Sequence, residues 1–334
     1  MNMSEYKNDV IKYLNTYFPT VITNLITEYG YYLEGKTLLT LREHYNAVTS
    51  VDVLPDQRIV SSSKDGTLKI WNPHNYQKQC EITECSNKSG ISYCTVLING
   101  KIISSSHGFL IKIWKVQDDK CICENILSSI FSHRFVTVFP NGNIITANAR
   151  YISLWNVSDN DNNYDYVLIP NKQNEPVNCM AYLQNGQVVT ASFYRRKLRV
   201  WKLNEEKNDT IRLIGHSAGI TCVISSLDGS MIVSGSFDKT LKIWNPNNID
   251  KKSRSIKCDL TLIGHVDAVK CVKFLPDGRI ISGSDDCTLK VWNPMTGECS
   301  NTFVGHNNSV SCVTIMSDGK IVSGSDDDTI KIWY

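Results

Sequence analysis

The chain reads Thr329-Ile330-Lys331-Ile332-Trp333 near its end, a short run in which apolar and polar side chains alternate before a tryptophan. A comparable run precedes each of the seven tryptophans in the sequence, which are Trp71, Trp114, Trp155, Trp201, Trp244, Trp292 and Trp333. Their successive spacings are 43, 41, 46, 43, 48 and 41 residues. A repeat of roughly 40 to 45 residues with four short strands is typical of a β-propeller, in which each repeat forms one blade. The sequence therefore predicts an all-β, seven-bladed β-propeller.

Tight turns divide each repeat into strands. Six copies carry Asn-Gly or Asp-Gly, at 99–100, 141–142, 185–186, 228–229, 277–278 and 318–319. These dipeptides supply the positive φ values that a tight hairpin requires. The first copy has Asp56-Gln57 at this place. Alternating runs such as 279–284 and 288–292 follow, and they predict strands packed against neighbouring blades.

The composition favours a protein that works by local recognition. The chain has 334 residues, 35 Lys and Arg, and 33 Asp and Glu, which gives a formal charge of +2. This balance provides no general attraction to nucleic acid or to membrane phosphate. Residues 1–8 lack the features of a secretion signal, and no apolar run reaches about 18 residues. We expect a cytoplasmic protein, with the nucleus as the alternative, that is monomeric outside complexes and does not bind membranes. Nucleic acid is disfavoured as a partner, and binding of a phosphate backbone through the basic turns is the alternative, which predicts a steep dependence on salt.

The 12 cysteines do not predict a disulfide framework. Cys179, Cys222, Cys271 and Cys312 occupy matching places in successive repeats, which indicates small buried apolar residues in a reducing compartment. Cys121 and Cys123 are two potential metal ligands without a second pair at zinc spacing, so ordinary strand packing is favoured. We expect no metal and no cofactor.

The last copy carries Gly305-His306, then Asp318-Gly319, and then the run from Ser323 to Trp333 with Asp327 six residues before the tryptophan. This order resembles the WD40 repeat family, and the resemblance extends over about residues 36–334. It implies a propeller that binds protein or peptide partners as a non-enzymatic scaffold. The amino-acid sequence of the repeats also resembles that of WD40 proteins of giant DNA viruses.

The resemblance further implies a hydrogen-bonded set of His, Ser or Thr, Asp and Trp within a blade. Four copies contain the required residues: His44, Asp65 and Trp71; His216, Asp238 and Trp244; His265, Asp286 and Trp292; and His306, Asp327 and Trp333. The hydroxyl can come from either serine of pairs such as Ser234 and Ser236. The other copies lose both partners together, with Asn87 and Gly108, Ser129 and Ala149, and Gln173 and Arg195 in their places. Removing one member of a buried pair leaves the other buried without a partner, which is destabilising. We therefore expect the pair to be kept or lost as a whole.

We interpret these sets as structural, because fourfold repetition around a ring is unlike a catalytic triad. The stretch 215–219 matches the Gly-x-Ser-x-Gly pattern of a nucleophile elbow. That pattern requires a helix after it, whereas 220–224 reads as a strand. We therefore expect no enzymatic activity, although a site in the central channel is the alternative from another class.

Two segments outside the repeats receive separate predictions. Residues 36–42 precede the first repeat as an outer strand would, and the last repeat stops after its third strand. We expect 36–42 to close the last blade, as in similar propellers, and so to remove an exposed sheet edge. Residues 1–35 show two apolar helical stripes separated by Pro19 and predict two short helices. These helices either pack on the propeller or dock a partner, and their sequence resembles the opening of an F-box. The alternative function is therefore a substrate receptor of a ubiquitin ligase.

A partner surface is predicted where the repeats diverge. The turns that carry the Asp lie on the face that the WD40 family commonly uses for partners. The residues assigned to this surface are His107, Phe109, Arg150, Tyr151, Phe193, Tyr194, Arg195, Arg196, Lys197 and Phe237. Asp285 and Asp326 provide an acidic side opposite the basic and aromatic one. This distribution favours an acidic or phosphorylated protein segment as partner, although the turns are equally well explained as solvated loops. The basic residues Lys251, Lys252, Arg254 and Lys257 lie in an insertion that we interpret as a flexible loop.

Overall fold

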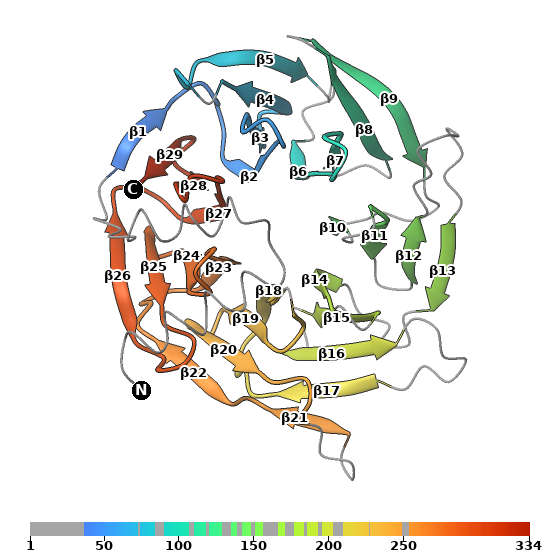
Figure 1. Cartoon of the computed structure of the whole chain (residues 1–334), viewed down its shortest axis with the longest axis vertical. Helices are drawn as coiled ribbons and strands as arrows, with labels where there is room; N and C mark the ends of the chain where they lie inside the picture. Colours follow the sequence, from blue (N-terminus) through green and yellow to red (C-terminus); the bar gives the residue numbers. More distant parts are fainter. Residues whose placement is uncertain are drawn as a thin grey trace.

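The computed structural model is a ring of seven antiparallel blades (Figure 1). It describes residues 37–72, 74–83, 90–106, 110–117, 120–128, 135–138, 142–147, 151–155, 166–170, 177–183, 186–192, 196–202, 210–226, 228–248 and 254–334. Within these ranges there are 29 strands, and no helix is long and apolar enough to cross a membrane. The helices predicted over residues 1–35 lie outside the described ranges, so their packing and the adaptor role remain predictions.

Each blade is a meander of four strands numbered outward from the central channel. Blade 1 contains β2 (Val48–Val53), β3 (Ile59–Ser63), β4 (Thr67–Trp71) and β5 (Lys78–Thr83). Blade 2 contains β6 (Ile91–Val96), β7 (Ile102–Ser106), β8 (Leu110–Gln117) and β9 (Lys120–Ser128). Blade 3 contains β10 (Phe135–Val138), β11 (Ile144–Ala147), β12 (Tyr151–Trp155) and β13 (Tyr166–Pro170). Blade 4 contains β14 (Val177–Tyr182), β15 (Gln187–Ser192), β16 (Lys197–Lys202) and β17 (Thr210–Ile214).

The remaining blades follow the same order. Blade 5 contains β18 (Ile220–Ser225), β19 (Ile232–Ser236), β20 (Thr240–Trp244) and β22 (Leu260–Ile263). Blade 6 contains β23 (Val269–Phe274), β24 (Ile280–Ser284), β25 (Thr288–Trp292) and β26 (Cys299–Val304). Blade 7 contains β27 (Val310–Ile315), β28 (Ile321–Ser325), β29 (Ile330–Trp333) and, from the other end of the repeats, β1 (Thr37–Leu41).

The tryptophan at or near the end of each third strand packs against the preceding blade. Trp71 lies in one apolar cluster with residues of blade 7, and Trp333 packs on Phe303 of blade 6 with ring centroids 5.6 Å apart. The other five tryptophans also join the cluster of the blade before them. Removing a side chain of this size from water stabilises the fold by about 4 to 6 kcal/mol. The spacing of 41 to 48 residues between tryptophans is therefore the spacing of the inter-blade contacts.

Ring closure uses three contacts between distant parts of the sequence. β1 pairs antiparallel with β29, and Lys331 Nζ donates to Thr40 Oγ1 at 2.8 Å. On the channel side, Ser311 Oγ of blade 7 donates to the backbone oxygen of Val48 in blade 1. Gly324 allows this approach, because a Cβ there would lie 2.5 Å from Val48 Cγ1. The outer strand expected over 36–42 is thus β1.

The turns between first and second strands use the predicted left-handed residue in every described case. Gly100, Gly142, Gly186, Gly229, Gly278 and Gly319 have φ values from 68° to 86°. In the first copy Gln57 takes this conformation with a φ of 70°. Its side-chain oxygen accepts a 2.9 Å hydrogen bond from the backbone N–H of Ser317 in blade 7. The departure from Asp-Gly therefore keeps the turn and adds a contact across the closure.

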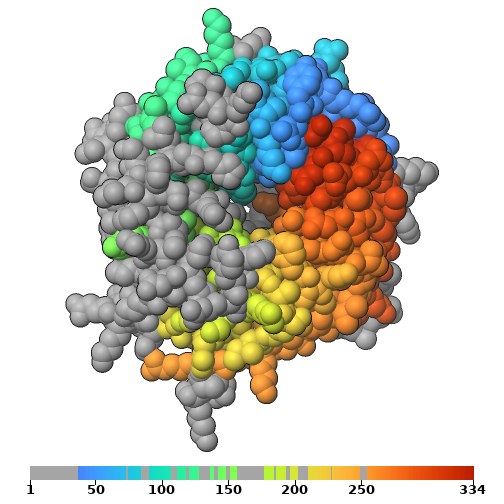
Figure 2. Space-filling view, turned by 180° about the vertical axis from the view of Figure 1, so that it is seen from behind, coloured from blue at the N-terminus to red at the C-terminus, as the bar shows by residue number. Residues whose placement is uncertain are grey.

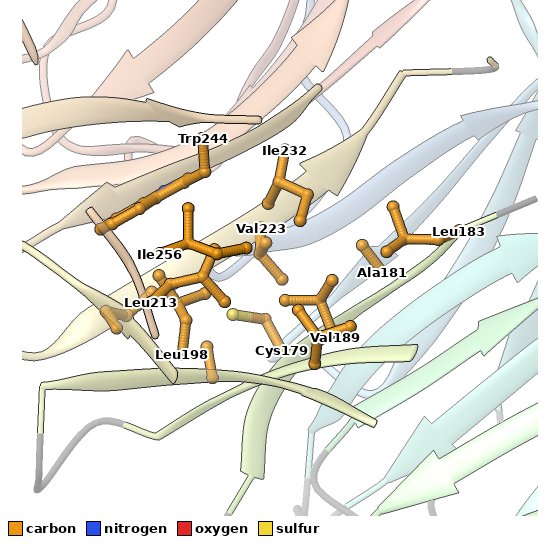
Figure 3. Close-up of a cluster of buried hydrophobic side chains, with 13 residues drawn as sticks. Cys179, Ala181, Leu183, Val189, Leu198, Leu213, Val223, Ile232, Trp244 and Ile256 are labelled. Carbon is orange, nitrogen blue, oxygen red and sulfur yellow. The ribbon is translucent and has the colours of Figure 1, made fainter. Parts of the chain in front are cut away.

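The interpretation of the basic insertion as a flexible loop is wrong for its second half. Residues Ser255–Lys257 form β21, which leaves blade 5 and pairs parallel with β17 as the fifth strand of blade 4. Ile256 is fully buried in a cluster with Leu213 and Trp244 (Figure 3). One apolar residue inside the basic run therefore anchors it, because the side chain fills a gap between two blades. Lys251 and Lys252 lie outside the described residues.

Candidate interaction face

Four blades contain a hydrogen-bonded set that links a loop to the tryptophan. In blade 6, His265 Nδ1 lies 2.7 Å from Asp286 Oδ2, and His265 Nε2 lies 2.8 Å from Ser282 Oγ. Trp292 Nε1 donates to the same Ser282 oxygen at 2.8 Å. Equivalent sets join His44, Asp65, Ser61 and Trp71; His216, Asp238, Ser234 and Trp244; and His306, Asp327, Ser323 and Trp333.

The two serines of the second strand have different roles, a point that the sequence leaves open. In blade 5, Ser234 receives the tryptophan N–H and contacts the histidine. Ser236 instead donates to the backbone oxygen of Gly219 and accepts from the N–H of Asp238. The first serine therefore completes the set, and the second ties the adjacent loops together.

The aspartates of the sets are ionised. Burial alone would raise the pKa of Asp286, but hydrogen bonds from His265 and Thr288 outweigh it and hold that pKa far below the ordinary value of 3.8. The pKa values of Asp65, Asp238 and Asp327 are lowered for the same reasons. The histidine side chains are 0 to 1% exposed. A buried, fully paired group of this kind stabilises a loop and is poorly placed to meet a substrate.

Each set also orients the residue that follows its histidine. The backbone N–H of Tyr45 donates to Asp65 Oδ2 at 3.1 Å, and that of Val266 donates to Asp286 Oδ2 at 3.0 Å. The side chains then point into solvent, where Tyr45 is 86% and Val266 73% exposed. Sequence reasoning missed both residues, although their position immediately after the repeated histidine is a usable signal.

A second exposed aromatic residue, Phe237, lies beside a charged group between blades 5 and 6. Lys270 Nζ is 5.1 Å from the centre of the Phe237 ring and 3.4 Å from Asp285 Oδ2. Ser309 Oγ of blade 7 also donates to Asp285. Asp285, which we expected to form an acidic patch, is therefore engaged in contacts that join three blades.

Four of the predicted partner residues are described. Phe237 is 38% exposed, Arg196 and Lys197 are exposed, and Tyr151 begins β12 half-buried. Arg196 has a φ of 55°, close to the φ of 70° for Lys239 at the same turn position of blade 5. Blade 4 thus keeps the turn although Arg195 replaces the Asp. His107, Phe109, Arg150, Phe193, Tyr194 and Arg195 lie outside the described residues, and their assignment to the surface stays a prediction.

The four blades with complete sets are consecutive in the ring. Blades 5, 6, 7 and 1 adjoin one another on one side of a narrow central opening (Figure 2). Their loops present Tyr45, Phe237 and Val266 between structural aspartates. In the same part of the chain, the Gly-x-Ser-x-Gly stretch at 215–219 leads into strand β18 and not into a helix. No group of three or more His, Cys, Asp or Glu side chains suited to a metal ion occurs in the described ranges.

Comparison with known proteins identifies the repeat. The family model described as "WD domain, G-beta repeat" matches residues 35–72, 208–245, 256–293 and 297–334. A guanine nucleotide-binding protein subunit beta from Zea mays is 27% identical over 252 residues, which are 72% of this chain and 53% of the relative. The corresponding subunit from Arabidopsis thaliana is 25% identical over 252 residues, and a subunit beta-2 from Nicotiana tabacum is 26% identical over 251. The chain spans about half the length of these curated relatives.

Proposed function

We propose that this chain, which carries WD40 repeats on a seven-bladed propeller, is a non-enzymatic scaffold that binds a protein partner on the face formed by the His–Asp loops. The observation that carries the proposal is the double role of each set. It removes its histidine and aspartate from solvent and, through the aspartate, fixes the neighbouring residue in an outward position. Rigid exposed aromatic side chains bind partners at a low cost in conformational entropy.

The guanine nucleotide-binding beta subunits that resemble the chain support a role in protein assembly, since each is by name one subunit of a larger protein. The side chains of the surface itself define the chemistry of the partner.

The chemistry of the face favours a partner segment with an apolar anchor and acidic flanks. Tyr45, Phe237 and Val266 provide apolar contact area, whereas Arg196 and Lys197 provide cations on blade 4. Asp285 is already paired with Lys270, which reduces the negative charge available to repel such a segment. An acidic or phosphorylated segment gains charge-assisted hydrogen bonds from the arginine.

The test is partner capture by surface variants of the full chain. Tyr45→Ala with Phe237→Ala should remove the partners that wild-type protein captures, and Arg196→Ala with Lys197→Ala should weaken the acidic ones. Met295→Ala with Ile98→Ala is the matched control, because these side chains are 70% and 66% exposed in turns at the opposite ends of the strands. An unchanged list of partners for the Tyr45 and Phe237 variant, or loss in the control alone, contradicts the proposal.

A further inference from the structure

Blade 2 extends over blade 1 at the outer rim of the ring. In blades 1, 3, 5, 6 and 7 the third strand ends at its tryptophan, whereas β8 continues three residues past Trp114. The extra residues pair with the start of β9, with Val116 opposite Cys121. Both side chains pack against the apolar cluster of blade 1, beside Cys80 and Ile82 of β5. The hairpin extension therefore places Cys121 of blade 2 against β5, the outer strand of blade 1.

The two sulfur atoms are in contact. Cys80 Sγ lies 3.4 Å from Cys121 Sγ, and both residues are half-buried, so small oxidants can reach them. A disulfide has an S–S distance of about 2.05 Å, so bond formation requires the sulfurs to approach by about 1.4 Å. Rotation of two side chains covers such a distance without moving the blades. The sequence predicts no role for Cys80, and it predicts that Cys121 is a packing residue.

We propose that Cys80 and Cys121 form a reversible disulfide that staples blade 1 to blade 2 under oxidising conditions. With hydrogen peroxide as oxidant, one thiolate attacks a peroxide oxygen and breaks the O–O bond, which gives a sulfenic acid and hydroxide. The proton that the thiol lost on ionisation converts this hydroxide to water. The second thiol then attacks the sulfenic sulfur and expels a second water molecule. The two sulfurs lose two electrons in total, and the peroxide accepts them together with two protons.

Burial, together with the adjacent Cys80, raises the pKa of Cys121 to about 12, so its thiolate is scarce at neutral pH. The reaction with peroxide is therefore expected to be slow at neutral pH. The bond closes a loop of about 40 residues and restricts the unfolded chain, which raises the stability of the oxidised form.

The experiment uses the full chain, reduced and then treated with hydrogen peroxide. Non-reducing digestion and mass spectrometry should recover a peptide that joins Cys80 to Cys121. The Tm should rise by about 5 °C or more and return to its starting value after addition of dithiothreitol. Cys80→Ser should abolish both the linked peptide and the rise in Tm.

Cys123→Ser is the matched control, because Cys123 is an exposed cysteine two residues further along β9. This variant should keep the linked peptide and the rise in Tm. The proposal is overturned if Cys121 is linked only to Cys123 or to Cys85, if no bond forms, or if the bond forms without a change in Tm.

Discussion

Blades 1, 5, 6 and 7 differ from blades 2, 3 and 4 in how their tryptophans are supported. In the first group the tryptophan N–H ends a chain of hydrogen bonds that begins at an ionised aspartate and passes through a histidine and a serine. In the second group the sequence lacks that His and Asp, yet the last bond persists. Trp114, Trp155 and Trp201 donate to Ser104, Thr146 and Thr190 at 2.8, 3.0 and 2.6 Å.

This difference shows that the interactions that build a blade are distinct from the interactions that fix its loops. A buried tryptophan with one hydroxyl acceptor is sufficient to build a blade in the ring. The His–Asp pair adds control over the loop above it, where Tyr45 and Val266 project. The four matches of the family model fall on the four blades with complete sets. The family model therefore detects the blades that contain the His–Asp pair, whereas the fold depends on the tryptophan that all seven blades share.

The largest expected effect comes from removing β1, the outer strand of blade 7, which belongs to the group with complete sets. Deletion of residues 37–41 leaves β29 of blade 7 without an outer partner and uncovers an apolar cluster that includes Leu41. We expect the Tm of the whole ring to fall by more than about 10 °C in a thermal unfolding scan. Replacing 255–257 by Ser-Gly-Ser should cost less, because blade 4 keeps its own four strands. An unchanged Tm in the first variant contradicts the closure argument.

A single substitution in a complete set should come next. Asp286→Ala leaves His265 buried without its partner, and we expect a loss of about 3 to 5 kcal/mol in the free energy of unfolding. The double variant His265→Leu with Asp286→Ala removes both members and should recover part of that loss. Denaturant unfolding of these two variants and of His265→Leu measures the losses. If the loss in the double variant equals the sum of the losses in the two single variants, the pair is not coupled.

A comparable change in an incomplete blade should have a smaller effect. Thr146→Val removes a hydroxyl acceptor of Trp155 Nε1, and it should cost about 1 to 3 kcal/mol. Ser153→Ala is the control in the same blade, since Ser153 is fully buried and has no hydrogen-bond partner among the described residues. This control should be nearly neutral. Equal losses in the two variants would mean that the loss of a buried hydroxyl, and not of the hydrogen bond to Trp155, determines the result.

Acid should reveal the smallest difference. The pKa of each aspartate in a set lies below its ordinary value of 3.8, so its contribution is present above about pH 4 and is lost as the pH falls further. Between pH 6 and pH 3 each set should lose about 1 kcal/mol. A variant with Leu in place of both His265 and Asp286 should therefore lose about 1 kcal/mol less than wild type over this range. An equal loss in the free energy of unfolding for wild type and variant between pH 6 and pH 3 would contradict the assignment.

Much of the fold was predictable because one period governs it. The tryptophans with their alternating runs occur seven times and the turn dipeptides six times, so the number of blades and the outer position of β1 follow from simple counting. Features that occur once were not predictable in this way. β21 adds to blade 4 because Ile256 fits a gap between two blades, and the extension of β8 is visible only in its pairing with β9. The exposed Tyr45 was missed because its orientation depends on a hydrogen bond to a residue 20 positions away.

The pairing of β1 with β29 has a consequence for synthesis on the ribosome. Lys331 and its partner Thr40 are 291 residues apart in the sequence. At about 5 to 20 residues per second, β1 emerges roughly 15 to 60 s before the strand that it pairs with. During this interval the nascent chain carries an unsatisfied strand edge beside incomplete blades. Chaperone capture of β1 is therefore expected to end only when the final repeat leaves the exit tunnel.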